Sequence, residues 1–124
     1  MEIKDSKFYR DKCFINGEWV NSDSGETISV NNPANLKEIG TVPKCGTSET
    51  RNAIEAANNA WPEWRAKSAR QRSEILRKWF DLMIENKEEL AQIMTVEQGK
   101  PINESRGEIG LSLIHISEPT RLEP

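Results

Sequence analysis

The sequence has few of the residues on which the chemistry of active sites usually depends. Its 124 residues include one histidine and two cysteines. Cys13 and Cys45 are too few for a disulfide framework, and their spacing is not that of a metal-binding knuckle. The single histidine, His115, lies close to the C-terminus, where it has neither cysteine as a sequence neighbour. We therefore interpret both cysteines as reduced, partly buried thiols.

Long apolar runs and an excess of positive charge are also missing. No stretch approaches the roughly 18 apolar residues that a membrane-spanning helix needs, and residues 1–10 lack the apolar region of a secretory signal. A formal net charge of −3 gives no electrostatic reason to expect nucleic acid or an acidic membrane as a partner. The sequence has no nucleophile elbow and no phosphate-binding loop. These absences favour a cytoplasmic protein without nucleic-acid or membrane partners.

Residues 12–44 carry the pattern of short strands joined by tight turns. The pair Asn16 and Gly17 lies between apolar residues and predicts a two-residue hairpin turn, which needs positive φ values. Residues 27–32 alternate between apolar and polar, as in a half-buried strand, and a proline-containing turn precedes a further strand over residues 38–42. We expect three or four short antiparallel strands.

At Thr47 the spacing of apolar residues changes to the helical period of about 3.6. Thr47 or Ser48 is expected to cap a first helix, with Glu49 in its positive first turn. An alanine-rich face on this helix suits close packing against another element. Pro62 is expected to end or bend the helix, because it lacks the backbone N–H and its ring opposes continuation.

Two further helices and the start of a fourth follow. Ser68 and Gln71 have the spacing of a capping box, and Asn86 with Glu89 repeats that spacing, which predicts a break before a third helix. Gly99 is expected to end the third helix in a left-handed conformation. The second helix carries an apolar stripe of Ile75, Leu76, Trp79, Phe80 and Met83.

Other candidate sites have simpler explanations. Glu88 and Glu89 suit a solvated helix face better than a catalytic pair, and the basic run over residues 65–72 is expected to face solvent. The tryptophans could form a ligand cage, but packing in a core is favoured for them. They are Trp19, Trp61, Trp64 and Trp79.

The helices carry more apolar surface than three short strands can cover, which implies an exposed apolar patch and a missing partner. That partner is either another chain or the rest of this one.

Five motifs in order resemble the N-terminal part of the aldehyde dehydrogenase superfamily. Over residues 6–109 they are most similar to the bacterial succinate-semialdehyde dehydrogenases. The resemblance implies an α/β fold in which short antiparallel strands precede long helices of the cofactor-binding domain, assigned to residues 1–109. The motifs are FINGEWV, NNPAN, EIGTVPKCG, AIEAANNAWPEWR and RQRSEILRKWFDLMIENKEELAQIMTVEQGKP.

The resemblance implies an oxidoreductase that converts an aldehyde to a carboxylic acid with NAD(P)+. In the family a cysteine thiolate attacks the aldehyde carbonyl and a glutamate activates the water that releases the acid. The family's catalytic and cofactor-binding residues lie beyond the point where the match stops, and neither Cys13 nor Cys45 lies in the family's nucleophile motif. We therefore assign no catalytic or cofactor-binding residue in this chain. We expect the 124-residue chain to be inactive and to bind no cofactor. Full-length family members are homo-oligomers that act on small aldehydes.

The resemblance also implies one cation site in this chain. Some relatives hold a monovalent cation with backbone carbonyl groups before the N-P turn and a carboxylate before the G-K-P motif. The matching positions are Val30, Asn31 and Glu97, and an oxygen-only ligand set suits a hard cation. The simpler interpretation is that Glu97 ends a helix in contact with water.

Residues 110–124 depart from the family pattern. The run LSLIHISEPTR resembles a translated sequencing adapter, so we interpret residues 110–124 as a tail that is not native. The alternative is a C-terminal strand, because Leu111, Leu113 and His115 alternate with the residues between them.

Two other interpretations remain open. The chain could be a short non-enzymatic protein that pairs with a full-length dehydrogenase. It could also belong to a dehydrogenase of a different aldehyde, such as glutarate semialdehyde or betaine aldehyde. The residues present do not separate these substrates.

Overall fold

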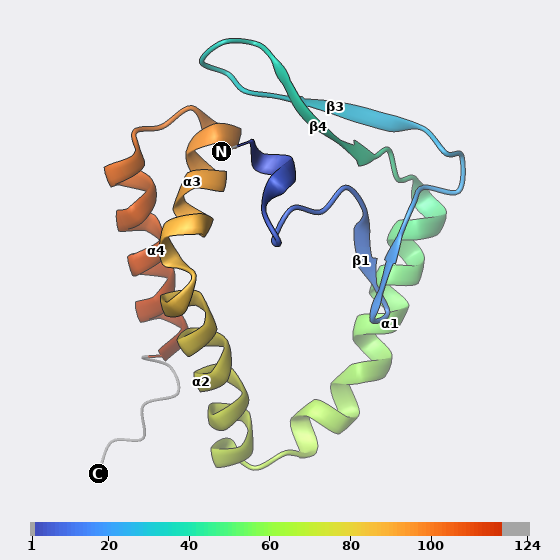
Figure 1. Ribbon diagram of the computed structural model, residues 1–124. Coiled ribbons are helices and arrows are strands. Elements are labelled where there is room, and N and C mark those ends of the chain that lie inside the picture. The colour runs from blue at the N-terminus through green and yellow to red at the C-terminus, as the bar shows by residue number, and fades with distance from the viewer. Residues whose placement is uncertain (1, 118–124) are drawn as a thin grey trace. The chain divides into compact units, whose positions relative to one another are not determined.

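The computed structural model describes residues 2–117, which divide into two compact units with a boundary between Glu63 and Trp64. We call residues 2–63 the strand unit and residues 64–117 the helical unit (Figure 1). Helix α1 runs across the boundary. In chain order the elements are a 3₁₀ turn η1 (Ile3–Asp5), β1 (Cys13–Ile15), β2 (Glu18–Val20), β3 (Thr27–Asn31), β4 (Glu38–Pro43), α1 (Thr47–Ala66), α2 (Ala69–Glu85), α3 (Lys87–Gln98) and α4 (Ile102–Ser117).

The strand unit contains two antiparallel hairpins, which confirms the predicted strands. Strand β1 pairs with β2, and β3 pairs with β4. The turn of the first hairpin has φ values of 53° at Asn16 and 80° at Gly17, as its sequence predicts. The second hairpin has a register shift between Val30 and Asn31. Its turn contains Leu36 in a positive-φ conformation.

Helix α1 differs from its prediction at both ends. It begins at Thr47, so Thr47 and Ser48 are both helical and neither is its cap. The helix also continues past Pro62 to Ala66, so Pro62 does not end it, and the alternative of a bend at Pro62 stays a prediction. A proline inside a helix removes one backbone hydrogen bond, and here the residues that follow still complete a turn.

The three helices of the helical unit begin and end largely where the sequence predicts. Ser68 and Gln71 form the complete capping box in front of α2. A break does occur at Asn86, but its side chain makes no capping bond to α3 and instead donates to the carbonyl of Leu82. Gly99 ends α3 with a φ of 73°.

Apolar side chains from all three helices meet in one core of the helical unit. Helix α4 packs against α2 and α3, and Figure 1 shows α3 and α4 side by side. Ala91 in α3 is completely buried, and Ile109 and Leu113 in α4 are nearly so. Partly buried side chains surround these three, namely Phe80, Met83, Leu90, Met94 and Ile102.

Helix α4 continues without interruption through Gly110 to Ser117. The alternative of a C-terminal strand over residues 111–115 is therefore wrong. The reason is the spacing of four between Ile109 and Leu113, which extends the buried face of the helix by one turn. The interpretation of residues 110–124 as a non-native tail stays a prediction, and residues 118–124 lie outside the described residues.

None of the helices within residues 2–117 combines the length and the apolar character that crossing a membrane requires.

Candidate functional site

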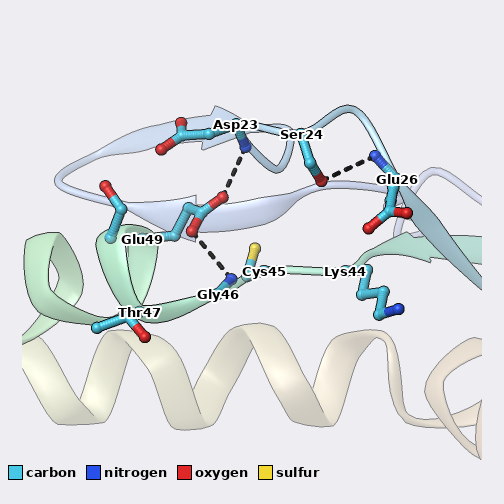
Figure 2. Close-up of a pocket in the computed structure, with 9 residues that line it drawn as sticks. Asp23, Ser24, Glu26, Lys44, Cys45, Gly46, Thr47 and Glu49 are labelled. Atoms are coloured by element: carbon cyan, nitrogen blue, oxygen red, sulfur yellow. Dashed lines mark hydrogen bonds between the residues drawn. The ribbon is translucent and has the colours of Figure 1, made fainter.

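The strand unit has an open pocket of about 370 Å³, which we call the Glu49 pocket. One wall comes from the turn that follows β2, and the other comes from the linker between β4 and α1 together with the first turn of α1 (Figure 2). Its lining residues are Asp23, Ser24, Glu26, Lys44, Cys45, Gly46, Thr47, Ser48 and Glu49.

The carboxylate of Glu49 connects the two walls. Its Oε1 atom accepts a hydrogen bond of 2.6 Å from the backbone N–H of Asp23, and its Oε2 atom accepts one of 2.9 Å from the backbone N–H of Gly46 (Figure 2). Ser22 reinforces the same turn, because its hydroxyl donates to the carbonyl of Glu26. Glu49 is 6% exposed, so these bonds have little competition from water.

These hydrogen bonds give Glu49 a structural role. The backbone N–H of Asp23 is the largest of the contributions that hold the pKa of Glu49 below its usual value, followed by the N–H groups of Glu49 itself and Gly46. A general base at neutral pH needs a raised pKa. The pKa of Glu49 is lowered, and its two hydrogen bonds hold the two walls of the pocket together.

Cys45 faces the same pocket, and its thiol is not activated. Its Sγ atom donates a hydrogen bond to Sγ of Cys13 over 3.7 Å. Burial is the main cause that raises the pKa of Cys45, and the hydrogen bond with Cys13 and the negative charges of Glu49 and Asp23 act in the same direction. A nucleophilic cysteine needs a lowered pKa, so Cys45 has the opposite of the property required.

Both cysteines are half-buried, as expected, and the interpretation of them as reduced thiols stays a prediction. Their proximity was missed by sequence reasoning. Cys13 and Cys45 are 32 residues apart and lie in different elements, so no local spacing indicates that they meet.

The predicted cation ligands fall in separate units. Val30 and Asn31 lie at the end of β3, at the register shift with β4. Glu97 lies in the last turn of α3 and is exposed. The ligand set of Val30, Asn31 and Glu97 stays a prediction. Within residues 2–117, histidine, cysteine and acidic side chains form no group of three that could hold a metal ion.

Glu88 takes part in an ion pair. Its carboxylate accepts two hydrogen bonds from the guanidinium of Arg106, of 2.8 Å from Nε and 2.7 Å from Nη2. This bidentate hydrogen bonding is the chief cause that lowers the pKa of Glu88, and it also raises the pKa of Arg106. Glu88 therefore joins α3 to α4 on the surface.

The tryptophans do not form the core that the sequence favours. Trp19, Trp61 and Trp79 are 47%, 52% and 54% exposed, and Trp64 is half-buried. Trp19 instead packs against the ring of Phe14 at 5.1 Å. Core packing was the wrong interpretation for the three exposed rings, because each unit has too few elements to cover them. The wider expectation of exposed apolar side chains is confirmed.

Known proteins resemble this chain across almost its whole length. The sequence profile of the aldehyde dehydrogenase family matches residues 19–120. The chain belongs to the aldehyde dehydrogenase family. It is 58% identical over 109 residues to a glutarate-semialdehyde dehydrogenase of Pseudomonas putida, and the match covers 88% of this chain and 23% of that enzyme. It is 53% identical, with the same two coverages, to the succinate-semialdehyde dehydrogenase [NADP(+)] of Escherichia coli.

Solved structures of aldehyde dehydrogenases have the same fold as this segment. A crystal structure of an NADP-dependent enzyme of E. coli aligns with a TM-score of 0.91 at 50% identity, over 94% of this chain and 24% of that one. A succinate-semialdehyde dehydrogenase from Burkholderia pseudomallei aligns with a TM-score of 0.90 at 48% identity, with the same coverages. The α/β fold class, with short antiparallel strands before long helices, is therefore confirmed. The chain spans about a quarter of the length of these aldehyde dehydrogenases.

Proposed function

We propose that the whole protein to which this chain belongs oxidises succinate semialdehyde or glutarate semialdehyde to the diacid with NAD(P)+. The observation that carries the proposal is the identity of 58% to a glutarate-semialdehyde dehydrogenase and 53% to a succinate-semialdehyde dehydrogenase over the same 109 residues. The two substrates differ by one methylene group, and an apolar pocket separates such substrates by only about 1–3 kcal/mol. One enzyme of this type can therefore accept both, with one preferred.

We propose further that residues 1–109 belong to the cofactor-binding domain and that the 124-residue chain alone has no activity. Its described strands form two antiparallel hairpins. Dinucleotides are held at the carboxyl edge of a parallel sheet, beside the N-terminus of a helix. The two groups in the Glu49 pocket that resemble catalytic residues, Cys45 and Glu49, have pKa shifts opposite to those that catalysis needs.

A chimera tests whether residues 1–109 are a working part of such a dehydrogenase. The segment of the E. coli succinate-semialdehyde dehydrogenase that matches residues 1–109 is replaced by residues 1–109 of this chain. We expect the chimera to assemble and to form NADPH from NADP+ with succinate semialdehyde and glutarate semialdehyde. A folded, assembled chimera without activity toward either aldehyde would contradict the proposal.

A second chimera, which carries residues 1–117, tests the assignment of the tail. If residues 110–117 are not native to the family, this chimera loses activity while the shorter one keeps it. Equal activity of the two chimeras would contradict a non-native tail.

The isolated 124-residue chain is the third arm. We expect it to reduce neither NAD+ nor NADP+ with any aldehyde, and to bind a hydrophobic dye through its exposed apolar side chains. A monodisperse chain that binds a full-length dehydrogenase would instead favour the non-enzymatic alternative.

A further inference from the structure

The structure brings together the two cysteines of the chain. Cys13 begins β1, and Cys45 lies in the linker between β4 and α1. Their sulfur atoms are 3.7 Å apart, and both side chains are half-buried. No other cysteine occurs in the 124 residues, so an internal disulfide in this chain has one possible pairing.

We propose that Cys13 and Cys45 are a redox-sensitive pair that forms a reversible disulfide with a small disulfide oxidant such as oxidised glutathione. One cysteine thiolate attacks a sulfur of the oxidant and releases one molecule of the small thiol. The second cysteine then attacks the protein-bound sulfur of the mixed disulfide and releases the second small thiol. The two cysteines lose two electrons and two protons, which the two released thiols carry away.

The geometry requires little movement. A disulfide has an S–S distance of about 2.05 Å, so the two sulfur atoms must approach by about 1.7 Å. Cys45 lies in a linker between two elements, where a small change of side-chain and backbone angles is tolerated. The thiol of Cys45 has a raised pKa and is not activated. The feature that favours the disulfide is therefore the proximity of the two sulfur atoms.

The crosslink joins two parts of the strand unit that are far apart in the sequence. It ties the β1–β2 hairpin to the linker that also donates the Gly46 N–H to Glu49. Oxidation therefore stabilises the strand unit, because the closed loop restricts the unfolded chain.

The test is the thiol–disulfide equilibrium of the full 124-residue chain in glutathione buffers of known ratio. Mass spectrometry distinguishes three products, namely the internal disulfide, which has lost two hydrogen atoms, the glutathione adduct and the crosslinked dimer. We expect the internal disulfide to dominate in native buffer, with an effective thiol concentration at least roughly a hundredfold above that in guanidinium chloride. The same value in both solvents, or adducts and dimers as the main products, would overturn the proposal.

A matched variant moves one thiol by one residue. In Cys13→Ser/Phe14→Cys the new thiol lies at a neighbouring strand position, where the side chain is directed to the opposite face of the hairpin. We expect this variant to form glutathione adducts in native buffer. Its effective thiol concentration in native buffer should be no higher than that in guanidinium chloride. If it closes an internal disulfide as readily as the unaltered chain, the pairing of Cys13 with Cys45 is wrong.

Discussion

In the strand unit a polar side chain connects segments that are far apart in the sequence, whereas in the helical unit apolar side chains do so. Glu49 bonds to the turn at Asp23, which is 26 residues away. In the helical unit Ala91 lies against Ile109 and Leu113. The hydrogen bonds of Glu49 depend on the charge of its carboxylate, and the packing of the helical core depends on the volumes of its side chains. The two units are therefore expected to respond to different perturbations.

The largest expected effect is the loss of a core side chain in the helical unit. Leu113→Ala removes buried volume next to Ile109 and Ala91, and we expect the free energy of unfolding to fall by about 2–5 kcal/mol. Urea denaturation, monitored by the circular dichroism signal of the helices, measures this free energy. Leu111→Ala is the matched control, because Leu111 is 54% exposed in the same helix and its loss is expected to cost within about 0.5 kcal/mol. Equal effects of the two variants would show that the core does not include α4 beyond Ile109.

Next in size is the loss of the Glu49 carboxylate in the strand unit. Glu49→Gln places an NH₂ donor against a backbone N–H, so one of the two hydrogen bonds is lost. We expect the amide that loses its acceptor, either that of Asp23 or that of Gly46, to exchange with solvent at least roughly tenfold faster. Glu55→Gln, an exposed change in the same helix, is the control and should leave both amides unchanged. Unchanged exchange in Glu49→Gln would contradict the structural role of Glu49.

The same carboxylate makes the stability of the strand unit depend on pH. The pKa of Glu49 in the folded chain lies below its value in the unfolded chain, which is about 4.3. Its contribution is therefore fully present above pH ~4.3 and is lost as the pH falls through the lower, folded pKa. Acid should speed amide exchange at Asp23 relative to a reference amide in the helical core, and Glu49→Gln should abolish that difference.

A smaller effect is expected from a polar pair within the helical unit. The hydroxyl groups of Ser105 and Thr95 lie 2.7 Å apart, and Ser105 is completely buried. Ser105→Ala leaves the Thr95 hydroxyl without this partner, which should cost about 1–3 kcal/mol in the free energy of unfolding. Adding Thr95→Val should recover most of that loss, because both polar groups are then absent. A double variant no more stable than Ser105→Ala would contradict this account.

The smallest expected effect is the loss of the surface ion pair between α3 and α4. Arg106→Gln removes the fork that Arg106 makes with Glu88, and we expect a small fall in Tm at low salt. The fall should disappear at high salt, because ions screen exposed charges. Arg70→Gln serves as the comparison, since its pair with Glu74 lies within one helix and connects nothing else. A fall that persists at high salt would contradict a mainly electrostatic contribution.

The sequence predicted those features that depend on neighbouring residues. The hairpin at Asn16 and Gly17, the capping box at Ser68 and the left-handed Gly99 each rest on a local conformational preference. The break at Asn86 was predicted for the wrong reason, since its amide donates to the carbonyl of Leu82. Family membership was also predictable, because ordered motifs identify it without any geometry.

Features that depend on distant residues could not be predicted. The bond between Glu49 and Asp23, and the proximity of Cys13 and Cys45, require knowledge of which segments meet. The continuation of α4 was missed because the change of composition at Gly110 concealed the helical spacing from Ile109 to Leu113. Helices extend cooperatively where one buried face is maintained, so composition alone is a poor guide to where they end.

The exposed indole rings give the chain an optical property that needs no label. Trp19 belongs to the strand unit, Trp79 belongs to the helical unit, and about half of each residue's surface is exposed. Indole fluorescence shifts to shorter wavelength when water is excluded from the ring. Any polypeptide that covers these surfaces, whether joined to the chain or added to it, would shift the emission. Single Trp→Phe variants would then report, unit by unit, the order in which the surfaces are covered.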